Sequence, residues 1–241
     1  MREDRSIETE VLQRAVPEDA ERARLKSSLS RFQYRPSRRK GIPLCIRFSR
    51  FLFIHIPKTG GMSVAQAVYG RQVWHRTALA FLERNPEFFH KRTSFSVVRN
   101  PWDRAVSAYE FSCAGGSPKA TLADVPPAPM LKSFEIFTLD YLFANKDRLL
   151  DLDGIFRPQH VYVNDRDGRC LVNFLGRFEA MEELETRLTD LGAIKKPLRH
   201  LNRSSSRAAR DYRRYYQTPR LVDAIAEIYA RDVSQFSYQF G

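Results

Sequence analysis

Apolar residues are concentrated in a few short runs that alternate with amphipathic segments. Residues 51–56 (Phe-Leu-Phe-Ile-His-Ile) and 94–98 (Ser-Phe-Ser-Val-Val) are apolar along most of their length, and each is followed closely by a proline. Short apolar runs bounded in this way are typical of parallel strands that are buried on both faces. Residues 160–163 and 174–178 are further candidate strands.

Helical spacing marks the segments between and after these runs. Helices are expected over 63–69 and from Pro101, with Asn100 as the N-cap, to about residue 112. Apolar residues in 134–141 and 181–191 also repeat at helical spacing, and a last helix is expected to begin at 218–219 and to run to about residue 236. Strands that alternate with helices predict an α/β fold, a P-loop-like three-layer sandwich with a central, mostly parallel sheet flanked by helices.

The first fifty residues differ in character from the rest. A ragged helical pattern covers 7–29, and the prolines and glycine of 36–43 are typical of a linker. We therefore expect residues 1–49 to form a basic helical extension and linker, and residues 50–241 to form a single domain.

The chain is strongly basic, and its excess charge lies at the two flanks. It has 241 residues, with 40 Lys+Arg against 28 Asp+Glu, which gives a net charge of +12. Residues 22–50 contain ten basic residues and no acidic one, and residues 199–220 contain seven basic residues and one acidic one. This excess predicts an anionic partner, which could be nucleic acid, a membrane surface, an acidic polysaccharide or a polyphosphorylated small molecule.

Cysteine usage and the N-terminal sequence indicate a reducing compartment. Cys45, Cys113 and Cys170 are far apart, so neither a disulfide framework nor a cysteine-based zinc site is expected. The first residues are charged and lack the apolar run of a secretory signal. The run 51–56 is too short to span a membrane. We expect a cytoplasmic protein, and peripheral contact with a membrane surface stays open.

The segment Ile56-Pro-Lys-Thr-Gly-Gly-Met-Ser63, between the first strand and its helix, predicts an anion site. Its two glycines can take positive φ and let the backbone wrap closely around an anion. The backbone N–H groups would then point at a phosphate or sulfate at the helix N-terminus, while Lys58 supplies charge. The alternative is an ordinary Gly-Gly turn with an exposed lysine. Because Lys58 precedes both glycines, the segment is not a Walker A motif, which argues against an ATPase or GTPase.

A second segment, Arg99-Asn-Pro-Trp-Asp-Arg-Ala-Val-Ser-Ala-Tyr109, again runs from a strand end into a helix. Arg99 follows the strand at its carboxyl end, where open α/β sheets bind ligands. Ser107 lies on the helix and can face the same crevice, so that the two side chains could bind one phosphate. The alternative is that Arg99 caps the helix or forms an ion pair.

Together the two segments resemble those of the cytosolic and Golgi sulfotransferases that use 3′-phosphoadenosine-5′-phosphosulfate (PAPS). PKTGGMS is similar to their 5′-phosphosulfate loop PKTGGTS, with Met62 in place of threonine. RNPWDRAVSAY matches every fixed position of their 3′-phosphate motif RxPxxRxxSxY. Residues 156–160, 174–179 and 201–204 resemble the branch that sulfates carbohydrates, namely the heparan 2-O- and chondroitin-type enzymes and their bacterial relatives. The resemblance covers about residues 50–241 and implies the same fold.

The resemblance also implies a reaction and a set of binding residues. A sulfuryl group would pass from PAPS to an acceptor hydroxyl, with a carbohydrate as the expected acceptor and adenosine 3′,5′-bisphosphate (PAP) as the product. Lys58 would stabilise charge on the leaving oxygen, and no metal is required. The residues implied to bind the cofactor are Lys58, Thr59, Gly60, Gly61, Met62 and Ser63 around the 5′-phosphosulfate, Arg99 and Ser107 at the 3′-phosphate, and Asn202, Arg203 and Ser204 in a loop that closes over the nucleotide.

An alcohol nucleophile needs a general base, and the chain has five histidines. His75 is our candidate because it precedes Arg99 by 24 residues (99 − 75), and the heparan 2-O-sulfotransferases have a base histidine at a similar offset. Their second histidine, two residues later, is Thr77 here. His55 is expected to be structural, since it lies within a buried strand. Two other histidines are expected to be solvated, His90 and His200. The alternatives for the base are His160, Glu83 and Glu110.

Two other functions stay open from the sequence. A P-loop nucleotide kinase would share the phosphate-binding loop, although the order of Lys58 and Gly60 and the lack of a Walker B segment for magnesium argue against it. A nucleic-acid-binding protein would bind phosphates through its positive net charge. The tyrosines of 212–216, which lie among arginines, could stack on bases. If the resemblance holds, no nucleic acid partner is expected, and the basic run 22–50 would form a rim for an anionic acceptor or a membrane-associated glycan.

Overall fold

The computed structural model describes residues 41–116, 126–149, 152, 154–198 and 211–241, and the statements below concern these residues. The helix expected over 7–29 lies outside them, and so do most of the basic run 22–50 and the nucleotide-covering loop of Asn202, Arg203 and Ser204.

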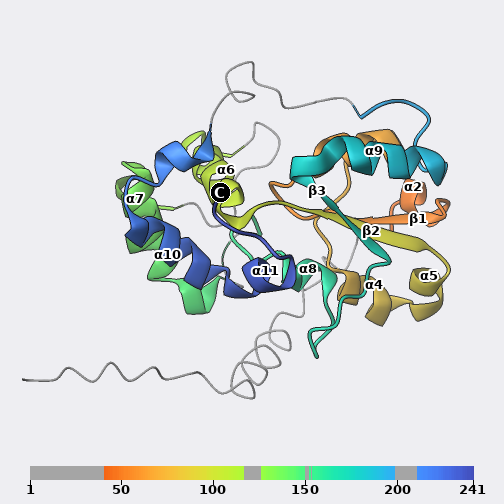
Figure 1. Ribbon diagram of the computed structural model, residues 1–241. Helices are drawn as coiled ribbons and strands as arrows, with labels where there is room; N and C mark the ends of the chain where they lie inside the picture. Colours follow the sequence, from red (N-terminus) through yellow and green to blue (C-terminus); the bar gives the residue numbers. More distant parts are fainter. Residues whose placement is uncertain (1–40, 117–125, 150–151, 153, 199–210) are drawn as a thin grey trace, which may run out of the picture.

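Three parallel strands form one sheet in the order β1-β2-β3 (Figure 1). They are β1 (Phe51–Ile54), β2 (Thr93–Val98) and β3 (Phe174–Arg177), and in the register Phe95 of β2 lies between Phe53 and Phe174. All of β1 and all but the first residue of β2 are buried, as expected for a parallel sheet covered on both faces. The predicted α/β fold with a parallel sheet is confirmed.

Helices connect and flank these strands (Figure 1). The crossover from β1 to β2 contains α3 (Gly61–Tyr69), α4 (Ala78–Arg84) and α5 (Pro86–His90), while α9 (Met181–Asp190) follows β3. The Tyr69 hydroxyl donates to the Phe51 carbonyl at 3.1 Å and accepts from the Phe53 N–H at 2.8 Å. It therefore satisfies backbone groups along the outer edge of β1. Before β1, the short helix α2 (Leu44–Arg47) contributes Ile46 to the core.

A second group of helices builds an aromatic core beside the sheet. It comprises α6 (Pro101–Cys113), α7 (Phe134–Ile136), the π-helical η2 (Phe137–Phe143), α8 (His160–Val163), α10 (Pro219–Ile228), α11 (Ala230–Gln235) and the short turns η1 (Ala128–Leu131), η3 (Lys146–Arg148) and η5 (Tyr212–Tyr215). The turn η4 (Phe178–Ala180) instead leads from β3 into α9. The ring of Tyr109 on α6 lies 5.5 Å from that of Phe134 and 5.2 Å from that of Phe137, centroid to centroid. The predicted helical spacing in 134–141 is thus confirmed.

The start of α6 agrees with its sequence. The Asn100 side-chain oxygen accepts hydrogen bonds from the N–H groups of Trp102 and Asp103 at 3.0 and 3.4 Å, and Pro101 occupies the first helical position. An asparagine cap followed by proline is a strong N-terminal signal, so this boundary could be predicted.

Two predicted elements are wrong. Residues 160–163 form the helix α8 and not a strand, because the Asp232 carboxylate accepts hydrogen bonds from the N–H groups of Gln159 and His160 at 2.6 and 2.9 Å and so caps the turn from a distant part of the chain. The last helix is also not continuous. It is interrupted at Tyr229, whose φ of −113° and ψ of 30° are not helical and whose hydroxyl donates to the Phe156 carbonyl at 2.9 Å.

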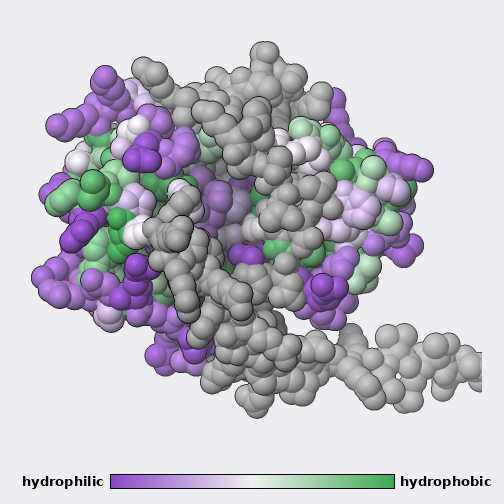
Figure 2. Space-filling view, turned by 180° about the vertical axis from the view of Figure 1, so that it is seen from behind, coloured by the Kyte–Doolittle hydropathy of each residue, from purple (hydrophilic) through white to green (hydrophobic). Residues whose placement is uncertain are grey.

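The surface of the described residues is mixed in polarity. In the view from behind, hydrophilic and hydrophobic side chains lie interspersed (Figure 2). Two of the most exposed apolar side chains, Leu44 and Phe48, lie on and just after α2. Within the described part of the chain, no helix combines the length and the apolar character that crossing a membrane would need.

Candidate active site

The turn between β1 and α3 has a backbone suited to anion binding. Lys58 and Gly60 both adopt positive φ, 69° and 77°, and Gly60 is the N-cap of α3. Thr59 is fully buried, and its hydroxyl donates to the Ile56 carbonyl at 2.9 Å, which fixes the turn from inside. The first N–H groups of a helix lack partners within the helix, so the start of this nine-residue helix favours an anion.

Gly60 and Gly61 are needed for different reasons. Gly60 takes the left-handed conformation, as the sequence predicts. Gly61 does not have a positive φ, and that part of the prediction is wrong. A Cβ on Gly61 would instead lie 2.2 Å from Cδ2 and 2.5 Å from Nε2 of the His55 ring. Gly61 is therefore required because the backbone passes directly against a buried histidine.

Arg99 joins the two segments identified in the sequence. Its Nε and Nη2 donate to the two carboxylate oxygens of Asp103, each at 2.7 Å, and its Nη1 donates to the Lys58 carbonyl at 3.0 Å. The guanidinium also lies 4.1 Å from the centroid of the Phe178 ring. The ion pair considered as an alternative role is thus present. A guanidinium has five N–H donors, so these three bonds leave two that can contact an anion.

Lys58 and Ser107 lie on the same side of α6. The Lys58 Nζ is 4.1 Å from the centroid of the Phe111 ring, and Phe111 follows Ser107 by four residues, which places both on one helix face. Ser107 is buried and Ser63 is partly buried, whereas Met62 is exposed. The structure thus brings the loop residues Lys58 to Ser63 close to Arg99, and it turns Lys58 toward the face of α6 that carries Ser107.

Arg104 has a role that the sequence reasoning did not find. Its side chain is 2% exposed, its Nε donates to the Pro57 carbonyl at 3.1 Å, and its Nη2 donates to the carbonyls of Ile155 and Arg157 at 3.1 and 2.8 Å. It therefore anchors the start of the anion-binding turn to a separate loop. An arginine on the apolar face of α6, one position before Ala105, is the signal that could have revealed it.

Gln159 and Asp232 hold the end of β2 in place. The Gln159 amide accepts from the Arg99 N–H at 2.9 Å and donates to the Arg99 carbonyl at 2.8 Å, so it fixes the backbone on both sides of that residue. Burial alone would raise the pKa of Asp232, but hydrogen bonds from His160 and from two backbone N–H groups hold this pKa below its ordinary 3.8. The His160 Nδ1 lies 2.7 Å from Asp232, so this histidine is a buried partner of Asp232 and is not placed as a general base.

His55 and His75 lie against each other beside the loop. Their ring centroids are 4.2 Å apart, His55 is buried and His75 is exposed. Burial, and secondly the charge of His75, hold the pKa of His55 well below 6.5, so that its ring is neutral. The His55 Nδ1 lies 3.2 Å from the Val73 carbonyl, and the His75 Nδ1 lies 3.0 Å from the His55 carbonyl. Because a carbonyl only accepts, each contact is a hydrogen bond in the tautomer whose Nδ1 carries the proton. In that tautomer of His75, the basic ring nitrogen is Nε2.

The other candidate bases have different surroundings. Glu83 forms an exposed ion pair with Arg166, and Glu110 accepts a hydrogen bond from the Tyr215 hydroxyl at 3.0 Å. His90 is exposed, as expected. His200 lies outside the described residues.

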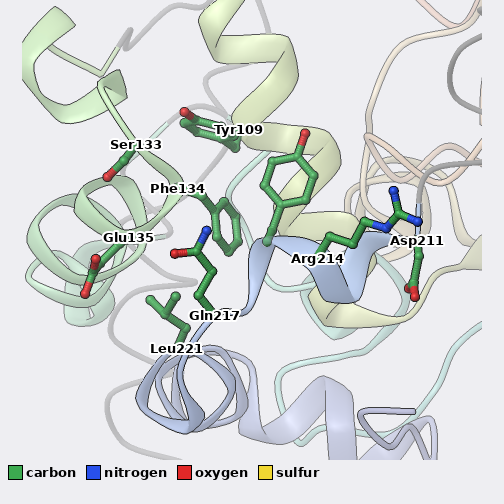
Figure 3. Close-up of a pocket in the computed structure, with 9 residues that line it drawn as sticks. Tyr109, Ser133, Phe134, Glu135, Asp211, Arg214, Gln217 and Leu221 are labelled. Atoms are coloured by element: carbon green, nitrogen blue, oxygen red, sulfur yellow. The ribbon is translucent and has the colours of Figure 1, made fainter.

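A pocket of about 410 Å³ lies on another side of α6 (Figure 3). Tyr109 lines it, and two residues along a helix correspond to a rotation of roughly 200°, so this residue faces away from the side that carries Ser107. Both aromatic and polar side chains line the pocket. Its lining residues are Tyr109, Ser133, Phe134, Glu135, Asp211, Arg214, Tyr215, Gln217 and Leu221.

A comparison with protein families decides between the functions left open by the sequence. A family model described as "Sulfotransferase family" matches residues 46–239, a span that includes both candidate anion-binding segments and β1 to β3. The chain belongs to the sulfotransferase family. Searches of curated proteins and of solved structures each found no match. Membership of this family does not favour the kinase or the nucleic-acid-binding alternative.

In this sulfotransferase, the turn after β1 and the segment after β2 meet at the carboxyl ends of adjacent parallel strands, where Arg99 contacts the Lys58 carbonyl. The described residues at this edge can bind anionic groups through Lys58, Arg99 and the N-terminus of α3. They can also accept a proton at His75.

Proposed function

We propose that this sulfotransferase takes its sulfuryl group from PAPS and transfers it to a hydroxyl group of a carbohydrate, with His75 as the general base. The observation that carries the proposal is the 3.0 Å contact between Arg99 Nη1 and the Lys58 carbonyl. It brings together the two segments in which we expect anions to bind, and PAPS carries an anionic group at each end of its ribose. A donor with a single phosphate would need only one of these segments.

The two segments would divide the nucleotide between them. The loop from Lys58 to Ser63 would hold the 5′-phosphosulfate, and Arg99 with Ser107 would hold the 3′-phosphate. PAPS, when bound, supplies the sulfuryl group and the PAP leaving group. Lys58 would stabilise the negative charge that develops on the bridging oxygen as the S–O bond breaks, because a cation fixed beside that oxygen costs no reorganisation during the reaction. Asn202, Arg203 and Ser204, which lie outside the described residues, would cover the nucleotide.

His75 would take the proton of the acceptor hydroxyl at its Nε2. The hydrogen bond from Nδ1 to the His55 carbonyl at 3.0 Å selects the tautomer whose Nε2 is a base. His55 stays neutral, so it does not oppose a positive charge on the neighbouring His75 ring.

The carbohydrate acceptor is supported by the resemblance in residues 156–160, 174–179 and 201–204 and by one observation near the base. Trp74, next to His75 in the sequence, is 47% exposed, and an indole face of this kind can pack against the apolar face of a sugar ring. Trp102 does not offer this, since it is buried and its Nε1 donates to the Val222 carbonyl at 3.0 Å. We further propose that the reaction takes place in the cytoplasm.

Thermal unfolding with PAP and with ATP tests the donor. A ligand that binds only the native state raises Tm, so we expect PAP to raise it and ATP to leave it unchanged. Lys58→Ala and Arg99→Ala should each weaken PAP binding, measured by calorimetry. A Tm that responds to ATP and not to PAP would refute PAPS as the donor.

Transfer from labelled PAPS to a panel of desulfated glycans tests the base and the acceptor. His75→Ala should abolish transfer and retain PAP affinity, whereas His90→Ala, a matched change of an exposed histidine, should leave both unchanged. Full turnover by His75→Ala would refute the base assignment, and Glu110 would then be examined. Labelling of a non-carbohydrate alcohol alone would refute the acceptor class.

A further inference from the structure

We infer that His55 is a positioning residue, which holds the ring of His75 in one tautomer and one orientation beside the phosphosulfate loop. The inference rests on the proposed function of His75 as the general base. Sequence reasoning assigned His55 only a structural place in a buried strand, and its contacts in the structure are more specific than that.

Three contacts of His55 link the base to the loop. Its Nδ1 donates to the carbonyl of Val73, two residues before His75, at 3.2 Å. Its ring packs against the ring of His75 at 4.2 Å between centroids and at an interplanar angle of 53°. Its Cδ2–Nε2 edge lies against the backbone of Gly61, in the space that a Cβ would occupy. One imidazole thus contacts the first residue of α3 on one side and the base on the other.

A purely apolar side chain could not make the same set of contacts. Phe53, two residues earlier on β1 and on the same face, shows what packing alone does there, since its ring stacks on His55 at 5.5 Å. Only a side chain with a donor can bind the Val73 carbonyl, and this bond fixes the chain that leads into His75. The ring must also be uncharged, because a positive charge 4.2 Å away would oppose protonation of the base, and the burial of His55 meets this condition.

The inference predicts a specific tautomer for His75. With the segment after Val73 held by His55, the His75 Nδ1–H stays on the His55 carbonyl and Nε2 remains unprotonated. If that segment is released, the ring loses the hydrogen bond that favours its Nδ1–H form. It should then revert toward the Nε2–H tautomer that a neutral imidazole prefers in water.

Nitrogen-15 NMR of the histidine rings tests this directly and requires no acceptor. The His75 resonances are assigned by comparison with His75→Gln, and the tautomer is read from the Nδ1 and Nε2 shifts at a pH where the ring is neutral. The matched pair His55→Leu and His55→Asn fills nearly the same volume, but only the asparagine can donate to the Val73 carbonyl. Phe53→Leu is the control for lost packing alone. PAP affinity is measured for every variant.

We expect the wild-type protein, His55→Asn and Phe53→Leu to show the Nδ1–H tautomer. His55→Leu should show a shift toward Nε2–H, while PAP affinity stays within about twofold of wild type in His55→Asn. If His55→Leu does not fold, His55→Met takes its place, since its flexible side chain fills irregular space. A wild-type ring in the Nε2–H form, an unchanged His75 in the Leu or Met variant, or the same change in Phe53→Leu would overturn the inference.

The NMR result is separable from the proposed function. Should His75→Ala retain transfer while His55→Leu still alters the His75 tautomer, the base assignment fails and the positioning contact stands as a structural fact without a catalytic purpose. If His75→Ala is inactive and the His75 tautomer is unchanged in His55→Leu, the assignment of His75 as the base is retained and the positioning role of His55 is refuted.

Discussion

Substituting Gly61 by alanine should destabilise the protein, although alanine is the better helix former. Gly61 is the first residue of α3, and its backbone lies against two buried rings of the β1 region, those of His55 and Phe53. Both rings are almost fully buried, at 4% and 1% exposure, so neither can move into solvent. The added methyl group therefore has no space that a small side-chain rotation could open.

The distances give the magnitude. A methyl carbon at the ideal position would lie 2.2 Å from His55 Cδ2 and 3.1 Å from Phe53 Cζ. Carbon atoms in contact are about 3.5–4.0 Å apart, so the His55 ring would have to move by more than 1 Å. Overpacking of this kind costs about 1–3 kcal/mol. The higher helix propensity of alanine offsets at most about 1 kcal/mol of this cost. We expect Gly61→Ala to lower the free energy of unfolding by about 1–2 kcal/mol.

Urea denaturation of Gly61→Ala and wild type measures this loss. Gly41→Ala is the control, because a Cβ there meets nothing within 4 Å, and its effect should stay within about 0.5 kcal/mol. The double variant with His55→Ala identifies the cause. If the clash is with the His55 ring, the two losses should not add, since removal of the ring makes room for the methyl group. Additive losses, or an unchanged stability of Gly61→Ala, would refute the steric account.

Three further predictions concern the supports of the site. Arg104→Met should lower the free energy of unfolding by about 3 kcal/mol or more, because three backbone carbonyls lose a charged donor. Arg104→Lys should not recover the wild-type stability, since lysine lacks the planar set of donors. Urea denaturation measures both variants. Asn100→Ala removes the N-cap of α6 and should cost about 1–2 kcal/mol in the same assay. Asp232 has a folded-state pKa below its ordinary 3.8, so its stabilisation is present above that value and is lost as the pH falls through the lower pKa. Asp232→Asn should therefore lower Tm at neutral pH and flatten the decline of Tm below pH 4, as followed by calorimetry at several pH values; an equally steep decline would contradict the assignment.

Local sequence patterns predict most of the fold. The buried runs of β1 and β2, the Asn100-Pro101 start of α6 and the spacing of Phe134 and Phe137 are each determined within a few residues, and each was predictable. The elements that were wrong depend on distant partners. His-Val-Tyr-Val at 160–163 has the composition of a strand, and it is helical because Asp232, seventy-two residues after His160, caps its first turn.

The candidate site shows the same division. The order of Lys58, Gly60 and Ser63 could be read as an anion-binding turn, because a strand, a loop and a helix follow one another directly. The need for glycine at position 61 could not be predicted, since it arises from the position of the His55 ring and not from the backbone conformation. The role of Arg104 is not predictable from the sequence, because its position in the motif does not indicate that its partners are backbone carbonyls in two separate loops.

Two long-range contacts beside the candidate site have a kinetic consequence. Asn100 donates to the Gln239 carbonyl across 139 residues of chain, and Gln159 donates to Asp232 across 73. Contacts between such distant residues form slowly, since the entropy of closing the intervening loop must be overcome first. We therefore expect the site to assemble after the main folding barrier. A nucleotide that binds only the assembled site would then slow unfolding and leave the folding rate unchanged, and so would lengthen the lifetime of the native protein without guiding its formation.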